Sequence, residues 1–445
     1  QSSGGLMSVE RAEAMPIRTA LSGPAAGTVG AIYQAKLGER ANIITLDMGG
    51  TSADVALIQN YESGIGYDRV VADFPVRLPM IDIHTVGAGG GSVAWFDKDN
   101  LMKVGPLSAG AEPGPACYSR GGKQATVSDA NLILGRLPDK LIGGAMSLDI
   151  AKAETAILPI AERLEFSIER TAHGIIGIVV SNMVRAIRAV SIERGHDPRD
   201  FSLMAFGGAG ALHAADVARE LDMKEIIVPP SPGILCAQGL VVSNLKEDFV
   251  VTRRLAYDQS TFQNIQKDLK GLVSRAEQWF QEEGIMGEDR ITRISFDMRY
   301  VRQNFELTIP WIELSGPPIL DYSSSLEVLT GRFYEQHEKT YGHFTEKDPI
   351  EIVNIRLMAL GRPSVEMDIV NGEQINNLPS PISERPVWFE SDKTAKTPVY
   401  SRSDLGSGHA LVGPVIIELL DAVTVIFPGD EVKVDGSGNL IIKVK

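Results

Sequence analysis

The segment Asn42–Ile58, NIITLDMGGTSADVALI, contains two apolar runs separated by a pair of glycines. The β-branched run before Asp47 predicts a buried strand, and the run after the glycines predicts a second strand returning beside it. Gly49 and Gly50 let the backbone approach a ligand closely, because no Cβ stands in the way. Thr51 adds a hydroxyl donor to the N–H groups of the turn. The segment therefore predicts a strand–turn–strand site for an anion.

Two carboxylates flank this turn, Asp47 before it and Asp54 after it. Neither would bind phosphate directly, but carboxylate oxygens suit Mg²⁺ held through water, and the cation then neutralises the phosphate. We predict that both aspartates act in catalysis and that Asp47 is a metal ligand. An ordinary hairpin with a Gly-Gly turn is the alternative, because short motifs often occur by chance.

A second glycine cluster lies in Phe201–Asp216, FSLMAFGGAGALHAAD. A buried strand, Ser202–Phe206, leads into a glycine turn and a predicted helix, Ala211–Leu221. The candidate ligand-binding glycines of this turn are Gly207, Gly208 and Gly210. A strand, a glycine turn and a helix N-terminus together predict a nucleotide site, although a Rossmann-type turn would need different spacing. His213 is either a packing residue or a polar, metal-binding group that faces the cleft.

A third glycine-rich segment, Val86–Ser92, indicates that something approaches its backbone closely, either a ligand or another strand. We take Gly89 and Gly90 as candidate binding residues. His84 just before this segment is a candidate metal ligand, although a lone histidine more often has a structural role.

The segment Thr126–Asn131, TVSDAN, precedes a short amphipathic run, Leu132–Leu137. Ser128 or Asp129 is a natural N-cap for a helix there. Asp129 is also a candidate metal ligand if it faces a cavity instead, so both interpretations stay open.

Composition narrows the class of protein. The chain has 445 residues, of which 44% are hydrophobic, and a net charge of −14. Such a charge argues against nucleic acid and anionic membrane as partners. The only cysteines, Cys117 and Cys236, lack CxxC spacing, which favours a reducing cytoplasm over a disulfide framework. No run of 18 apolar residues occurs, so we expect no membrane span.

The pattern changes along the chain, and we predict three parts. Residues 1–250 contain the glycine clusters and form an α/β nucleotide-binding core. Residues 251–380 alternate between amphipathic helices and strands, which indicates an α+β domain. Residues 381–445 consist of short β runs separated by Gly, Pro and Asp turns, which indicates a small β-rich module.

The hairpin resembles the phosphate-binding hairpin of the actin, Hsp70 and sugar-kinase superfamily. More closely, the chain resembles the hydantoinase A / 5-oxoprolinase family, which includes N-methylhydantoinase A and acetone and acetophenone carboxylase subunits. The segments that carry the resemblance include SGPAAG, DMGGTSADVALI, HTVGAGGGSVAWFD, TVSDANLILGRL, ERGHDPRDFSLMAFGGAGALHAAD, VPPSPGILCAQGL and YGHFTEKDPIEIVNIRLMALG. The resemblance implies an actin-like (ribonuclease H-like) ATPase core that binds ATP, with a Gly-Gly turn against the adenosine.

Two departures from the family pattern stand out. Arg302 occupies a position in RYVRQNFEL where the family leads us to expect glycine. The family also begins with a separate domain that carries a first phosphate hairpin, and ATP binds between the two halves. No segment here matches that first hairpin, so we expect it on residues preceding Gln1 or on a separate polypeptide.

The resemblance implies two chemistries, the ATP-dependent opening of cyclic amides and the ATP-dependent carboxylation of ketones. We predict the first, with this chain as the ATP-handling subunit or fragment of a hydantoin or 5-oxoproline hydrolase. We expect Mg²⁺ or another divalent metal, a small-molecule substrate and a hydantoinase B-type partner subunit. A ketone carboxylase subunit and a nucleotide-binding regulator without turnover are the alternatives.

The first prediction concerns completeness. Phosphoryl transfer requires the phosphates to be held from both sides, and a misplacement of about 1 Å can cost roughly 100-fold in rate. The 445-residue chain alone should therefore hydrolyse no ATP at a meaningful rate. An assay with Mg·ATP and candidate substrates, with and without the upstream domain and a B-type subunit, checks this. Full activity of the lone chain would contradict it.

Overall fold

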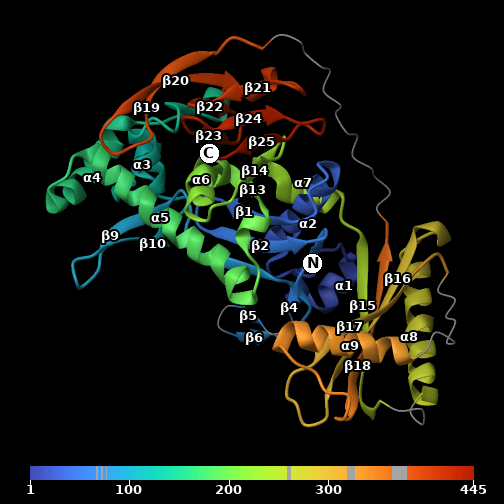
Figure 1. The fold of residues 1–445 in the computed structure, drawn as a ribbon. Coiled ribbons are helices and arrows are strands. Elements are labelled where there is room, and N and C mark those ends of the chain that lie inside the picture. The colour runs from blue at the N-terminus through green and yellow to red at the C-terminus, as the bar shows by residue number, and fades with distance from the viewer. Residues whose placement is uncertain (67–68, 72–73, 77, 258–261, 318–325, 363–377) are drawn as a thin grey trace. The chain divides into compact units, whose positions relative to one another are not determined.

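The structure is a computed structural model that describes residues 1–445 except 67–68, 72–73, 77, 258–261, 318–325 and 363–377 (Figure 1). Contacts divide the described residues into two compact units. Unit 1 contains the described residues of Gln1–Gly4, Arg18–Val242 and Met367–Lys445, and unit 2 contains those of Gly5–Ile17 and Ser243–Glu366.

The core of unit 1 is one sheet, to which nine of the described strands belong. Its order is β21-β24-β25-β14-β13-β1-β2-β3, and β8 also pairs with β2. The strands are β1 (Ile43–Met48), β2 (Ala53–Gln59), β3 (Glu62–Ser63), β8 (Ile83–Val86), β13 (Ser202–Phe206), β14 (Glu225–Val228), β21 (Ala410–Val412), β24 (Glu431–Val434) and β25 (Leu440–Lys443). Strands β1, β13 and β14 run parallel, and the predicted hairpin β1–β2 is antiparallel.

Helices cover both faces of this sheet (Figure 1). They are α2 (Ser22–Leu37), α3 (Val127–Ile133), α4 (Ile150–Leu164), α5 (Ile168–Val190), α6 (Gly207–Glu220) and α7 (Leu235–Val241). Alternate residues of β13 enter different cores. Leu203 packs with residues of α5 and α6, whereas Met204 packs with residues of α2 and α7. A parallel strand buried on both faces is continuously apolar, which explains the unbroken run at Ser202–Phe206.

Helix α5 is long and apolar enough to cross a membrane, and it alone among the described helices meets that criterion. More than half of its most apolar window is buried inside the protein, and Ile175, Val179 and Met183 belong to the core of unit 1. The core helix of a soluble protein meets the same criterion. The helix is therefore weak evidence for a membrane, and the absence of a span stays a prediction.

Two local predictions need correction, and the structure gives the setting of Arg302. Helix α6 begins at Gly207, so the glycine turn forms its first turn instead of preceding it. Thr126 is the N-cap of α3, and Asp129 is the third residue of a capping box, in which each side chain accepts from the other's backbone N–H. Arg302 has φ +79°, a left-handed conformation that explains why glycine suits this position.

The end of the chain contributes to the core of unit 1. Strand β25 pairs with β14, and Ile442 lies opposite Ile226. A second, four-stranded sheet contains β19 (Ser383–Trp388), β20 (Thr394–Ser401), β22 (Val415–Glu418) and β23 (Val423–Ile426). The contact-defined units therefore do not follow the three-part division at residues 250 and 380 expected from the sequence.

Unit 2 has α+β architecture. A four-stranded sheet of the order β15-β18-β16-β17 packs with helices around its own hydrophobic core. The elements are β15 (Leu245–Ala256), β16 (Arg290–Tyr300), β17 (Leu307–Ser315), β18 (Ile350–Gly361), α1 (Val9–Ala14), α8 (Phe262–Glu282) and α9 (Leu326–Tyr341).

A buried ion pair joins α6 to the C-terminal strands. The guanidinium of Arg219 donates to both carboxylate oxygens of Asp430, at 2.7 and 2.6 Å, and the backbone N–H of Lys445 donates to the same carboxylate. Asp430 is fully buried. Replacing Asp430 would remove the carboxylate that accepts from the half-buried guanidinium of Arg219.

The second prediction follows from this pair. Asp430→Ala should lower the free energy of unfolding by about 2–3 kcal/mol, because one member of a buried charge pair is removed. Urea unfolding of the purified variant measures this. The neighbouring Glu431→Gln is the control, since Glu431 pairs with Lys445 at the surface and its loss should change little. Equal stability of both variants would contradict the prediction.

Candidate functional site

The predicted hairpin turn faces open space. Strands β1 and β2 pair so that Asp47 lies opposite Asp54, and the N–H of Gly49 donates to the carbonyl of Ser52 at 3.0 Å. A Cβ added at Gly49 or at Gly50 would meet no described atom within 4 Å. The turn is therefore accessible to a ligand, as the sequence predicts.

The third glycine segment packs on this turn. The N–H of Gly90 donates to the carbonyl of Gly49 at 3.0 Å, and the N–H of Gly91 donates to that of Gly50 at 2.6 Å. A Cβ at Gly89 would lie 2.5 Å from the backbone nitrogen of Thr51. Of the two partners considered from the sequence, the hairpin backbone is the one that approaches Gly89.

Asp47 is held where three helices meet the end of β1. A Cβ at Gly207, which has φ +76°, would lie 2.5 Å from its Oδ1. A Cβ at Gly27 of α2 would lie 3.5 Å from its Oδ2, and the thiol of Cys236 on α7 donates to that oxygen at 3.2 Å. The end of β1 therefore needs small residues around it, and the carboxylate is fixed in place.

Burial changes the acid–base behaviour of these groups. Burial raises the pKa of Asp47, the Cys236 hydrogen bond opposes this, and the charge of Asp54 adds to it. Burial also raises the pKa of Asp54, against a hydrogen bond from the hydroxyl of Thr85. Burial and the nearby Asp47 raise the pKa of Cys236 to about 12, so it remains a thiol donor at neutral pH. Two partly buried carboxylates of this kind favour a bound cation.

The other predicted metal ligands lie apart from Asp47. His84 is exposed on β8. Asp129 is fully buried, and its carboxylate accepts from the backbone N–H groups of Ala116, Cys117 and Thr126 and from the Thr126 hydroxyl. Asp129 therefore caps a helix instead of facing a cavity. In the part of the chain that the structure describes, no three His, Cys, Asp or Glu side chains are grouped to hold a metal ion.

His213 is also fully buried, on the second turn of α6. The amide nitrogen of Asn131 lies 3.2 Å from its Nε2, and this amide can only donate, so the ring proton belongs on Nδ1. Burial lowers the pKa of His213 to about 4, although the charge of Asp216 opposes the shift. His213 is therefore a neutral residue in the wall of the cavity described next.

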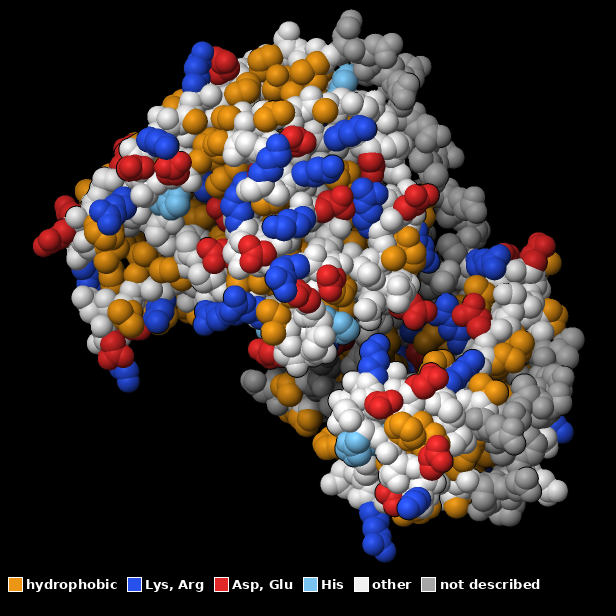
Figure 2. Space-filling model, in the orientation of Figure 1, with side chains coloured by type: hydrophobic (Ala, Val, Ile, Leu, Met, Phe, Trp, Pro, Cys, Tyr) orange, Lys and Arg blue, Asp and Glu red, His pale blue; other side chains and the backbone are white. Residues whose placement is uncertain are grey.

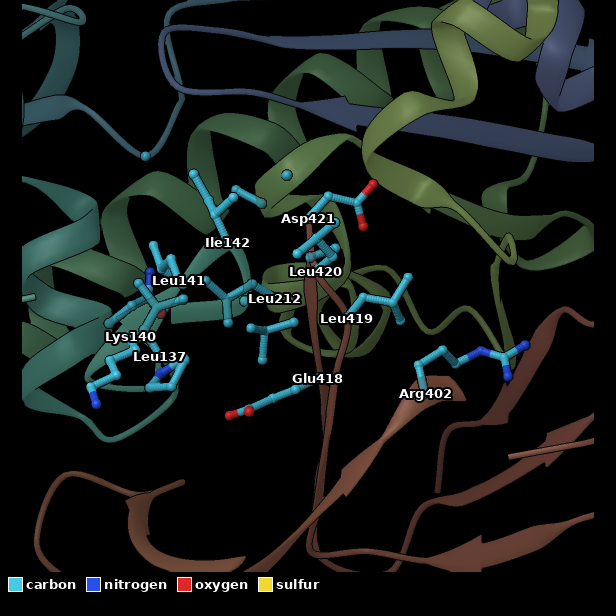
Figure 3. A pocket seen from close by; sticks show the side chains of 18 of the residues that line it. Leu137, Lys140, Leu141, Ile142, Leu212, Arg402, Glu418, Leu419, Leu420 and Asp421 are labelled. Atoms are coloured by element: carbon cyan, nitrogen blue, oxygen red, sulfur yellow. The ribbon is translucent and has the colours of Figure 1, made fainter. Parts of the chain in front are cut away.

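One cavity of about 1010 Å³ in unit 1 connects the glycine turns. Gly49, Gly50, Gly90 and Gly208 line it, together with Asn131 and His213. Most of its remaining walls come from two segments to which the sequence assigned no role at the site, Leu137–Gly144 and Glu418–Val423, and from Ser401–Ser403 (Figure 3). Gly207 and Gly210 pack closely on β1 instead of lining the cavity, since a Cβ on either would lie within 2.9 Å of backbone atoms of β1.

Charged side chains of both signs occur on the described surface. On the face drawn in Figure 2, Lys and Arg side chains are interspersed with Asp and Glu side chains. Among the described residues of this face, the charges alternate instead of forming one extended basic patch for a polyanion.

Comparison with known proteins identifies the family. The family model for hydantoinase/oxoprolinase matches residues 1–249. The caprolactamase subunit alpha of Pseudomonas jessenii is 35% identical over 98% of this chain and 63% of its own length. The crystal structure of the ATP-dependent caprolactamase from that organism superposes with a TM-score of 0.81 at 34% identity, over 95% of this chain and 61% of the other. A nucleotide-free acetone carboxylase structure gives a TM-score of 0.78 at 25% identity, over 100% of this chain and 64% of the other.

The chain belongs to the hydantoinase/oxoprolinase family, which confirms the family predicted from its motifs. The solved structures also confirm the predicted fold, an α/β core of the actin-like ATPase type. The chain spans between 61% and 64% of the length of these relatives.

The third prediction concerns the partly buried carboxylate pair Asp47 and Asp54. Because the pKa of Asp47 is raised in the folded state, its ionised form costs stability at neutral pH, and that cost disappears as the pH falls through the folded pKa. Asp47→Asn should therefore raise the melting temperature at pH 7.5 without ligands, and the gain should shrink at pH 5. Differential scanning calorimetry at both pH values measures this.

A control with the opposite sign is available in the same unit. Backbone N–H donors, chiefly that of Leu101, lower the pKa of Asp97, so its ionised form stabilises the fold above its unfolded pKa. Asp97→Asn should lower the melting temperature at pH 7.5. A lower melting temperature for Asp47→Asn as well would show that Asp47 is structural.

Proposed function

We propose that this chain is the ATP-handling part of an ATP-dependent hydrolase that acts on cyclic amides. The observation that carries the proposal is the single cavity that joins the hairpin turn at Gly49–Gly50, the wall at Gly90 and the helix turn at Gly208. A backbone turn with accessible N–H groups suits the phosphates, and a helix beginning with glycines suits the nucleoside. The volume of about 1010 Å³ is large enough for a nucleotide and a small substrate.

The carboxylates fit a divalent cation, Mg²⁺ or another metal. Asp47 and Asp54 lie opposite each other beside the open turn, and burial disfavours their ionised forms in the absence of a positive charge. They would hold the cation through water, and the cation would neutralise the phosphates. ATP would supply a phosphoryl group to the amide oxygen of the substrate, which converts that oxygen into a leaving group. The protein would supply position and charge.

The similarity to known enzymes supports one class of substrate for this chain over another. The similarity to a caprolactamase subunit supports a cyclic amide, either a lactam or a hydantoin. The similarity to acetone carboxylase supports the second candidate, a subunit of an ATP-dependent ketone carboxylase. We favour the first because the caprolactamase is more similar to this chain in both sequence and structure.

The proposal includes partners. We infer a hydantoinase B-type subunit and a domain with a second phosphate hairpin, since phosphoryl transfer needs groups on both sides of the phosphates. Both described cysteines are free, which agrees with a location in the cytoplasm.

Release of ADP tests the function. The complete protein with its partner subunit is incubated with Mg·ATP and either 5-oxoproline, hydantoin, caprolactam, or acetone with bicarbonate. ADP release that depends on a cyclic amide supports the proposal, and release that requires ketone and bicarbonate supports the carboxylase. Nucleotide binding without turnover on any substrate would identify a regulator.

The fourth prediction concerns the nucleoside side of the cavity. Gly208 is exposed, and the nearest described atom to an added Cβ is the carbonyl oxygen of Asp421 at 3.6 Å. Gly208→Val should weaken ATP binding at least tenfold without lowering the melting temperature much, because the branched side chain would enter the cavity. Calorimetric titration of the complete protein measures the affinity. Gly208→Ala is the matched control, whose single methyl group fits and should change the affinity little.

A further inference from the structure

Ile142 adopts an unfavourable backbone conformation in the cavity wall. It follows β11 (Lys140–Leu141) and has φ +53°, in the left-handed region that β-branched residues avoid. Its side chain is 55% exposed and lines the cavity. Strain of this kind costs stability and persists at sites where it serves a ligand. Packing alone does not explain the choice of isoleucine, because more than half of the residue is exposed.

Leu420 presents a second exposed apolar side chain to the same part of the cavity. It is 66% exposed, and it lies in the connection between β22 and β23. Its Cδ1 lies 3.1 Å from the position that a Cβ would take on Gly143, so Leu420 reaches the turn that carries Ile142. Leu141 and Leu212 also line this region, and Figure 3 shows the four side chains gathered on one side of the pocket, with Arg402 on the other.

We propose that Ile142 and Leu420 form an apolar clamp that binds the nucleobase of the nucleotide. This inference rests on the proposed function and adds the residues that hold the base. Exposed aliphatic side chains on two neighbouring segments of the cavity wall suit a flat ring, whose faces are the least hydrated part of a nucleotide. The Leu420 segment also borders the glycine turn, because the Asp421 carbonyl oxygen is the nearest described atom to an added Cβ at Gly208.

The position of the clamp favours a base over the reacting end of a substrate. The cavity is lined both by the hairpin turn, where the phosphates would bind, and by the segments that carry Ile142 and Leu420. A nucleotide with its phosphates at Gly49 and Gly50 and its sugar at Gly208 would place its base beyond Gly208. The hairpin end would then remain free for the substrate that accepts the phosphoryl group.

The test separates base binding from phosphate binding. Dissociation constants for ATP, ADP and inorganic tripolyphosphate are measured by calorimetry on the complete protein. Leu420→Ala and Ile142→Gly should each weaken ATP and ADP binding roughly tenfold, because apolar contact area is lost. Tripolyphosphate has no base, so its binding should not change. Ile142→Gly should also leave the melting temperature unchanged or higher, since glycine adopts positive φ without strain.

Two control variants make the same kinds of change, relief of a positive φ and truncation of an exposed leucine, at positions outside the cavity. Asp222→Gly relieves a similar conformation, φ +54°, at an exposed position that does not line the cavity, and should leave ATP affinity unchanged. Leu158→Ala truncates an exposed leucine on α4 and should do the same. Unchanged ATP affinity in both clamp variants, or an equal loss of tripolyphosphate affinity, would overturn the clamp alone. Failure of the unsubstituted protein to bind ATP would overturn the proposed function and the clamp together.

Discussion

The structure of unit 1 depends on the close approach of backbone segments around the carboxylate of Asp47. Gly207 on α6 and Gly27 on α2 leave room for its two oxygens, and Cys236 on α7 donates to one of them. A larger residue at Gly207 would meet both this carboxylate and the carbonyl of Met48 at 2.5 Å. The position of one charged group therefore dictates where three helices meet the sheet. The hairpin turn that follows Asp47 lines the cavity through Gly49 and Gly50.

Local patterns in the sequence were enough to predict the hairpin and the strands of the parallel core. Strands β1 and β13 are apolar runs that end at glycines, β2 is an apolar run that follows the glycines of the hairpin turn, and such runs are visible without any knowledge of their partners. The role of β25 was not visible in this way. Its pairing with β14 is a contact between residues far apart in the sequence, and a short β run at the end of a chain fits a separate module equally well. The N-cap at Thr126 could have been found, since threonine three residues before an acidic residue is a capping-box signal.

The candidate site shows a similar limit. Glycine clusters indicated Gly49, Gly50, Gly90 and Gly208, and all four line one cavity. The sequence could not indicate that Gly89 serves the hairpin backbone, because close approach by a ligand or by a strand requires the same residue. No local pattern assigned Cys236 or Leu420 to the site. They reach the site through the packing of α7 and of the β22–β23 connection, and no local spacing records such contacts.

Several features that reduce stability occur around this cavity. Asp47 and Asp54 are partly buried carboxylates whose ionised forms are disfavoured, and Ile142 is held at positive φ. His213 is fully buried, and no described residue lies within hydrogen-bonding reach of its Nδ1. Each feature by itself has a structural explanation, since ion pairs and turns also produce strain and shifted pKa values. Their concentration in the walls of one cavity and in the hairpin strands beside it is harder to explain by folding alone, because a chain optimised only for stability would replace them. A ligand that brings a cation to the carboxylates and an apolar ring to Ile142 would offset these costs on binding.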